Sequence, residues 1–120
     1  MPLYKQQRKI IFCDAAFDPK SKKAYIGYIS SCLKYSHTES LICNNINDAE
    51  YKAIELALKD FPNEDIRSDN DTAVNKFRNE HKKLNVSFIG RQWNIANTIV
   101  RRKFLKPNHL INSNLLSYSK

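Results

Sequence analysis

IIFCDAA, residues 10–16, is the stretch that decides the fold. Four apolar residues run without interruption from Ile10 to Cys13, and the acidic Asp14 follows them directly. A continuous apolar run, without the alternation of a half-exposed strand, is typical of a β-strand that is covered on both faces. The sequence therefore predicts a central buried strand with a carboxylate at its end.

Two further strands are predicted directly after this run. Residues 24–33 are rich in Tyr and Ile, and residues 39–43 follow after a short turn. Strands joined by short turns favour an antiparallel meander. Gly27, inside the second strand, indicates a bend or the close approach of another element.

The hydrophobic period then changes to that of α-helices, with short strands predicted at 65–68 and 86–89. Pro62 ends the first helix, and the third ends before Pro107. The apolar stripes are Ala53, Ile54, Ala57, Leu58 and Phe61 in the first helix, Ala73, Val74 and Phe77 in the second, and Trp93, Ala96, Val100 and Phe104 in the third.

The predicted order of elements is βββαβαβα. Strands separated by helices normally pair in parallel through right-handed crossovers. We therefore expect an α/β fold with a five-stranded mixed sheet and helices packed on it, over residues 1–106. Residues 107–120 are rich in Asn and Ser and are expected to form a loosely ordered C-terminal tail.

Composition narrows the classes of function. Twenty Lys and Arg residues oppose twelve Asp and Glu residues, a formal net charge of +8, which favours binding to polyanions. With two glycines in the chain, a Gly-rich phosphate loop is excluded. Three cysteines without CxxC spacing favour reduced thiols. The start lacks the apolar run of a signal peptide, and no segment approaches the ~20 apolar residues that span a bilayer, so we expect a soluble cytoplasmic protein.

Three carboxylates stand where apolar residues would be expected. Asp14 and Asp69 follow the first and fourth strands, which are both expected near the sheet centre and parallel, so their ends meet at one edge. Glu50 shares the sheet-facing stripe of the first helix, which can bring it over that edge. Carboxylates gathered at one edge repel one another unless a cation lies among them, and all-oxygen ligands suit Mg²⁺ or Mn²⁺.

Each carboxylate also has an ordinary structural explanation. Asp14 can start a turn where the chain leaves the strand. Asn47 and Glu50 have the spacing of a capping box, in which Glu50 would reach back to the start of the helix. Asp69 and its neighbours are favoured helix caps. Capping and metal binding are not exclusive, because a carboxylate near the start of a helix can also face a site.

Four segments, in order, resemble the ribonuclease H family. Residues 10–16 resemble the family's first strand, residues 47–58 its first helix, residues 66–70 its strand-to-helix "SDS" or "TDS" segment, and residues 86–97 its last strand, the "R-x-x-N-x-x-A-D" segment and its final helix. The resemblance places Asp14, Glu50 and Asp69 at three catalytic carboxylates. It departs from the family pattern at Asn97, where the family usually has Asp, and no histidine occurs between Leu84 and His109.

The resemblance implies a metal-dependent endonuclease that hydrolyses the RNA strand of RNA–DNA hybrids. Asp14 would bridge two Mg²⁺ or Mn²⁺ ions, Glu50 and Asp69 would complete their coordination, and Asn97 would be a weaker fourth ligand. No membrane partner and no small-molecule cofactor are expected. The predicted contacts to nucleic acid are Lys22, Lys23, Asn47, Arg91 and Asn94.

Two alternatives stay open at this point. One is a catalytically weakened or inactive nucleic-acid-binding domain on the same fold, which Asn97 favours and the three retained carboxylates oppose. The other is an interaction module of a larger nucleic-acid enzyme. Salt-dependent binding to a hybrid separates them, because counterion release accompanies nucleic-acid binding but is not required for a protein partner.

Overall fold

The computed structural model describes residues 9–83 and 85–105. The elements are β1 (Ile10–Asp18), β2 (Lys23–Ser30), β3 (Ser36–Ile42), α1 (Ile46–Asp60), β4 (Asp65–Ser68), α2 (Asp71–His81), β5 (Val86–Phe88), the 3₁₀ helix η2 (Arg91–Trp93) and α3 (Ala96–Leu105). The predicted tail, residues 107–120, lies outside the described residues.

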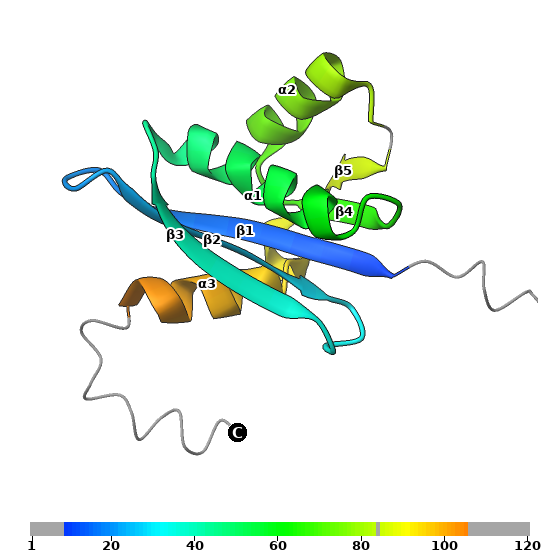
Figure 1. Cartoon of the computed structure of the whole chain (residues 1–120), viewed down its shortest axis with the longest axis horizontal. Helices are drawn as coiled ribbons and strands as arrows, with labels where there is room; N and C mark the ends of the chain where they lie inside the picture. The colour runs from blue at the N-terminus through cyan, green and yellow to red at the C-terminus, as the bar shows by residue number, and fades with distance from the viewer. Residues whose placement is uncertain (1–8, 84, 106–120) are drawn as a thin grey trace, which may run out of the picture.

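The strands form one five-stranded sheet in the order β3-β2-β1-β4-β5. The pairs β1–β2 and β2–β3 are antiparallel, whereas β1–β4 and β4–β5 are parallel. Helices α1 and α2 cover one face and α3 the other (Figure 1). The predicted α/β class, the mixed sheet and the order of strands and α-helices are confirmed.

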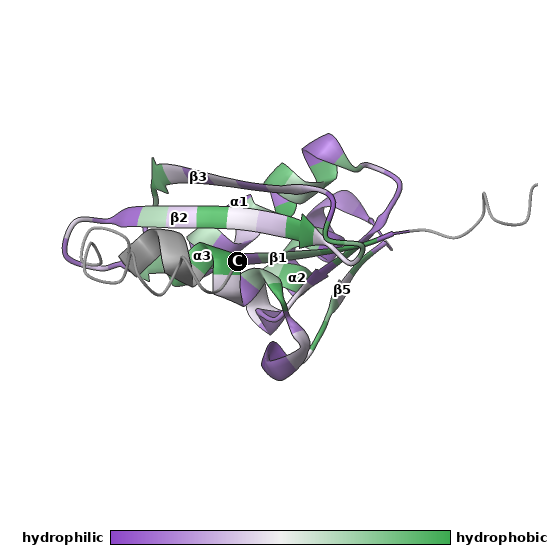
Figure 2. Cartoon of the chain, turned by 90° about the horizontal axis from the view of Figure 1, so that it is seen from below, coloured by the Kyte–Doolittle hydropathy of each residue, from purple (hydrophilic) through white to green (hydrophobic). Residues whose placement is uncertain are grey.

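The centre of the sheet is buried as the apolar run predicts. Ile11 of β1, Ile54 of α1, Ile66 of β4 and Val86 of β5 have no exposed surface. Burying a side chain of this size stabilises the fold by roughly 1.5–3 kcal/mol. The edge strand β3 is instead mostly exposed and largely hydrophilic (Figure 2). The core therefore lies between α1 and the β1–β4 pair, next to the predicted site.

The first strand is longer than predicted. It does not end before Asp14 but continues to Asp18, because its pairing with β2 runs on to Asp18↔Lys23. The hairpin closes where the Asp18 carboxylate accepts hydrogen bonds from Lys20 N–H and Ser21 Oγ, and Lys22 takes a left-handed conformation. Asp14 is consequently inside a strand rather than at the start of a turn.

The predicted apolar stripe of the last helix is wrong at Trp93. Asn94 has an extended backbone conformation, and its Oδ1 accepts a hydrogen bond from Ala96 N–H, so α3 begins at Ala96. Ala96 and Val100 are buried as predicted, whereas Trp93 belongs to η2 and is 65% exposed. The Phe104 side chain lies outside what the structure describes.

No helix within residues 9–83 and 85–105 has the length and apolar content needed to cross a membrane.

Gly27 confirms the predicted close approach of another element. A Cβ at this position would lie 2.8 Å from both His37 O and Thr38 Cγ2 of β3, and 3.2 Å from Val100 Cγ2 of α3. The residue therefore allows an edge strand and a helix to close on β2 at one point. This point lies directly opposite Asp14 in the register of the sheet.

We predict that Gly27→Ala lowers the free energy of unfolding by about 1–3 kcal/mol, because the added methyl group overlaps backbone that cannot move aside. Urea denaturation measures the change. Gly90→Ala is the matched control, since a Cβ there meets chiefly the end of the Gln92 side chain. Equal stability of the two variants would contradict the tight packing at Gly27.

Candidate metal centre

Asp14 lies where β1 extends beyond its parallel neighbour β4. The last pair between β1 and β4 is Cys13↔Ser68, so Asp14 is the first residue of β1 beyond β4. Opposed residues of antiparallel strands point to the same face, and a Cβ at Gly27 would meet Val100 of α3. The Asp14 side chain therefore lies on the α3 face, where it is 4% exposed.

Glu50 comes to the site from α1 and is not needed to cap that helix. The cap is Asn45, whose Oδ1 accepts a hydrogen bond from Asp48 N–H, while Asp48 Oδ2 accepts one from Asn44 N–H. The predicted capping box with Asn47 and Glu50 is therefore wrong, because the helix begins earlier. Glu50 is 6% exposed, and its Oε1 has no hydrogen-bond partner among the described residues.

Asp69 follows the last residue of β4, and it is also not a helix cap. Asn70 caps α2, with its Oδ1 accepting a hydrogen bond from Ala73 N–H at 2.8 Å. The half-buried Asp69 carboxylate instead lies beside Asp14 of β1.

The three carboxylates meet in one cluster. Asp14, Glu50 and Asp69 each offer an oxygen, and these oxygens lie within 4.8 Å of one another. Parallel pairing of β1 and β4 brings Asp14 and Asp69 to the same edge, as the sequence predicts. Glu50 joins them from α1, the helix packed against both strands.

Burial makes the ionised state of this cluster costly. It raises the pKa of Asp14 to about 6, with a further contribution from the negative charge of Asp69. It raises the pKa of Glu50 to about 10, and the charges of Asp14 and Asp69 add to this. The pKa of Asp69 is also raised by burial. Without a cation, the Asp14–Glu50 pair therefore retains a proton near neutral pH.

Arg91 is the positive group that acts on the whole cluster. Its charge lowers the pKa of Asp14, Glu50 and Asp69, against the larger effect of burial. Arg91 is exposed in η2 and was predicted to contact nucleic acid. It lies in the same short segment as Asn94, whose amide is bonded to Asp69 of the cluster.

Asn94 is the part of the site that sequence reasoning placed differently. It was predicted to contact nucleic acid, but it is 4% exposed and its amide binds inside the protein. Its Nδ2 donates to Cys13 O at 2.9 Å and to Asp69 Oδ2 at 3.2 Å. Asn94 thus ties β1, Asp69 and the start of α3 together.

Three other predicted residues, Asn97, Lys22 and Lys23, make contacts outside the carboxylate cluster. Asn97 is half-buried in the first turn of α3, and its N–H donates to Asn94 O. Lys22 and Lys23 lie at the hairpin end of β1, beyond Asp14. Lys22 Nζ donates to Asn44 O at 3.2 Å, and Lys23 Nζ lies 5.4 Å from the centre of the Tyr25 ring. The hairpin lysines are thus not part of the carboxylate cluster.

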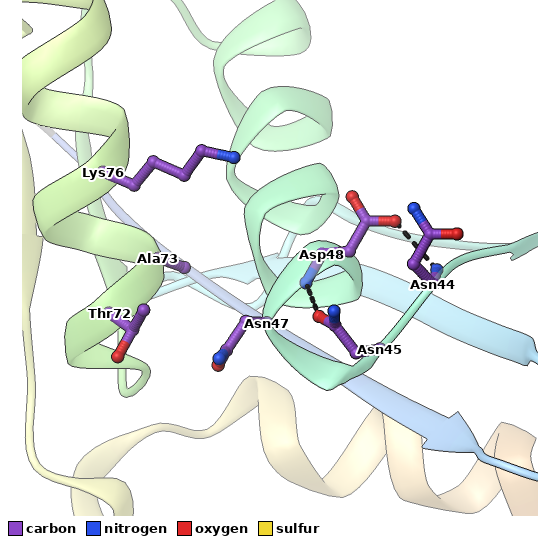
Figure 3. Close-up of a pocket in the computed structure, with 7 residues that line it drawn as sticks. All are labelled: Asn44, Asn45, Asn47, Asp48, Thr72, Ala73 and Lys76. Carbon is purple, nitrogen blue, oxygen red and sulfur yellow. Dashed lines mark hydrogen bonds between the residues drawn. The ribbon is translucent and has the colours of Figure 1, made fainter.

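A polar cavity of about 260 Å³ lies between the starts of α1 and α2 (Figure 3). Asn47, the remaining predicted contact, lines it, and Asn47 Oδ1 accepts a hydrogen bond from Asn70 Nδ2. The cavity is lined by Asn44, Asn45, Asn47, Asp48, Thr72, Ala73 and Lys76. Through Asn70 it adjoins the segment that carries Asp69.

The cluster fits a hard divalent cation. Three carboxylate oxygens are ligands of the kind that Mg²⁺, Mn²⁺ and Ca²⁺ prefer. The unpartnered, buried Oε1 of Glu50 supports this fit, because a buried polar atom without a partner costs about 1–3 kcal/mol. The described residues can therefore hold a metal ion at Asp14, Glu50 and Asp69.

A scan against protein-family models finds no match for the chain, and a search of curated proteins finds none either. The residues of the site are therefore the basis on which a function is inferred.

We predict that Asn94→Ala lowers the free energy of unfolding by about 1–3 kcal/mol, because it leaves Cys13 O and Ala96 N–H without their side-chain partner. Urea denaturation measures the loss. In the control Asn75→Ala, an exposed bond to Asp71 is removed, and the change should stay within about 0.5 kcal/mol. A parental stability for Asn94→Ala would show that the amide does not hold the site.

We predict that Glu50→Gln stabilises the metal-free chain, and that the gain grows as the pH rises from about 4 to about 8. The parent's folded state keeps a proton on Glu50 that the unfolded chain releases above its ordinary pKa of about 4.3, so the parent loses stability with rising pH. The variant has no such proton. Urea denaturation in EDTA across this pH range measures the difference.

Glu55→Gln, on the exposed face of the same helix, is the control for this pH series, because it removes a carboxylate that lies outside the cluster. Adding Mn²⁺ at pH 8 should stabilise the parent more than Glu50→Gln, since ligand binding to the folded state alone stabilises it. A pH-independent gain, with equal Mn²⁺ effects, would rule out a cation site at Glu50.

Proposed function

We propose that this chain is a ribonuclease H-type, metal-dependent endonuclease that hydrolyses the RNA strand of RNA–DNA hybrids. The observation that carries the proposal is the cluster of Asp14, Glu50 and Asp69, with Asp14 and Glu50 buried, at the point where the parallel pairing of β1 and β4 ends. Holding three acidic groups within 4.8 Å of one another, two of them buried, is costly for a fold that has no use for a cation there. The sequence resemblance adds the substrate class.

In this proposal Asp14, Glu50 and Asp69 hold the divalent cations, and Asn97 is a weaker fourth ligand because a carboxamide carries no charge. A bound cation lowers the pKa of an attacking water and stabilises the leaving 3′ oxygen. Asn94 keeps Asp69 in place through the bond between Nδ2 and Oδ2. Arg91 supplies positive charge where the phosphate of a substrate would approach the acidic cluster.

The basic composition supports a polyanionic substrate. A formal charge of +8 attracts nucleic acid over long distances, while the local negative charge of the cluster limits binding without metal. Minor-groove contacts to 2′-hydroxyl groups are the general means by which a protein distinguishes an RNA strand. An RNA–DNA hybrid offers both the negative charge of a polyanion and the 2′-hydroxyl groups of an RNA strand.

The second candidate is a nucleic-acid-binding domain of the same fold that has lost catalysis. Asn97 in place of a fourth carboxylate favours it, because the loss of a negative charge weakens the hold on a second cation. The buried trio of carboxylates opposes it, since a chain without catalysis gains stability by replacing them.

We predict that the parent cleaves the RNA strand of a labelled hybrid in Mg²⁺ or Mn²⁺, and that Asp14→Asn lowers the rate by at least about 100-fold through loss of a metal ligand. Gel analysis of the cleaved strand measures the rate. Asp71→Asn is the matched control: Asp71 opens α2 two residues after Asp69 and lies outside the cluster, so the rate should stay parental.

Absence of cleavage in both metals, together with tight and salt-sensitive binding of the hybrid, would instead favour the non-catalytic domain. Equal loss of activity in Asp14→Asn and Asp71→Asn would contradict the assignment of the cluster.

A further inference from the structure

Trp93 is an exposed aromatic residue that the proposed catalytic machinery does not use. It is the only tryptophan of the chain, and 65% of its surface is exposed. Phe88, at the end of the edge strand β5, is 52% exposed, and Ile95, directly before α3, is 39% exposed. All three lie between the end of β5 and the start of α3, in the segment that also carries the buried Asn94.

The position of Trp93 is fixed on both sides. Its N–H donates to Gly90 O at 2.9 Å, which closes the single turn of η2. A Cβ at Gly90 would lie at ordinary contact distance, 3.4 Å, from Trp93 Cδ1, so the edge of the indole lies close to the backbone of this turn. The next residue, Asn94, is buried and bonded to Asp69. Trp93 therefore stands on an anchored turn beside the carboxylate cluster.

A cation stands on the same turn. Arg91 is exposed, and its charge acts on all three carboxylates. One three-residue helix thus presents an exposed guanidinium and an exposed indole, and the residue that follows it, Asn94, is bonded to Asp69 of the cluster. Proteins that bind single strands or splayed bases combine these two groups, since an aromatic face stacks on a base while a basic group contacts the adjacent phosphate.

We propose that Trp93 is a stacking platform for one nucleobase of the strand bound at the carboxylate cluster, with Arg91 contacting a phosphate next to that base. This inference rests on the proposed function, because it requires nucleic acid at the site. The occupant is a base rather than an apolar protein surface because the platform adjoins Arg91 and a candidate cation site, both of which attract phosphate.

The lone tryptophan makes the platform directly observable. The experiment uses the full chain with Ca²⁺ in place of Mg²⁺, and an unlabelled RNA–DNA hybrid with a short single-stranded overhang. Fluorescence excited selectively at tryptophan should be quenched as the hybrid saturates the protein. Anisotropy of an end-labelled hybrid, in a separate titration, gives the Kd.

Trp93→Ala should weaken hybrid binding by about 5- to 150-fold, the range that corresponds to loss of one base–aromatic stack. Trp93→Phe should restore most of the affinity because it keeps an aromatic face. Leu33→Ala is the matched control: Leu33 is 66% exposed in the β2–β3 turn, near the amino-terminal end of β1, and its variant should bind as the parent does. Thermal unfolding of each variant verifies that the fold is intact.

The outcomes separate the two proposals. Parental affinity of Trp93→Ala, with unquenched fluorescence in the saturated parent complex, would overturn the platform and leave the proposed function standing. Absence of hybrid binding by the folded parent would overturn both. If the parent self-associates, and Trp93→Ala abolishes this self-association without changing hybrid binding, the platform is overturned. Trp93 is then assigned to contact with a second copy of the chain.

Discussion

Three carboxyl groups with oxygens within 4.8 Å of one another, two of them almost completely shielded from water, can coexist only if a proton or a cation offsets their charge. The structure around the three carboxyl groups brings them together and places positive charge near them. The pairing of β4 with β1 stops at Cys13, one residue before Asp14. Glu50 of α1 can therefore approach Asp14 from the other face of the sheet. The Asn94 amide holds the carboxylate of Asp69, and Arg91 supplies nearby positive charge. The geometry of the centre thus follows from where one short strand stops.

The pattern of apolar residues along the sequence was sufficient to predict much of this arrangement. The unbroken run at 10–13 predicted the buried central strand, and the βαβ order predicted that Asp14 and Asp69 share an edge. Asn94 could not be assigned in the same way. Its side-chain amide bonds to Cys13, which is 81 positions away in the sequence, and to Asp69, which is 25 positions away. No local sequence pattern encodes contacts over such separations. Tertiary contacts also decided the length of β1, which depends on its pairing with β2.

Local polar chemistry explains the remaining differences. Several residues before α1 can cap it, and the sequence alone does not rank them; Asn45 is the one that accepts from Asp48 N–H. That choice leaves Glu50 without a capping role and with an unpartnered oxygen. Trp93 fitted a helical spacing, but the backbone break at Asn94 removes it from α3. In both places a side-chain hydrogen bond to the backbone fixed the start of the helix at a residue other than the predicted one.

The three bonds of Asn94 also have a consequence for the dynamics of the chain. Its Oδ1 accepts from the first residue of α3, while its Nδ2 donates to the backbone of β1 and to Asp69. Fraying of the first turn of α3 removes one of the three bonds that hold this amide beside Asp69, so opening of the helix start is coupled to the acidic centre. Slow hydrogen exchange at the Ala96 amide is therefore a reporter of the integrity of the centre, and cation binding should slow it further.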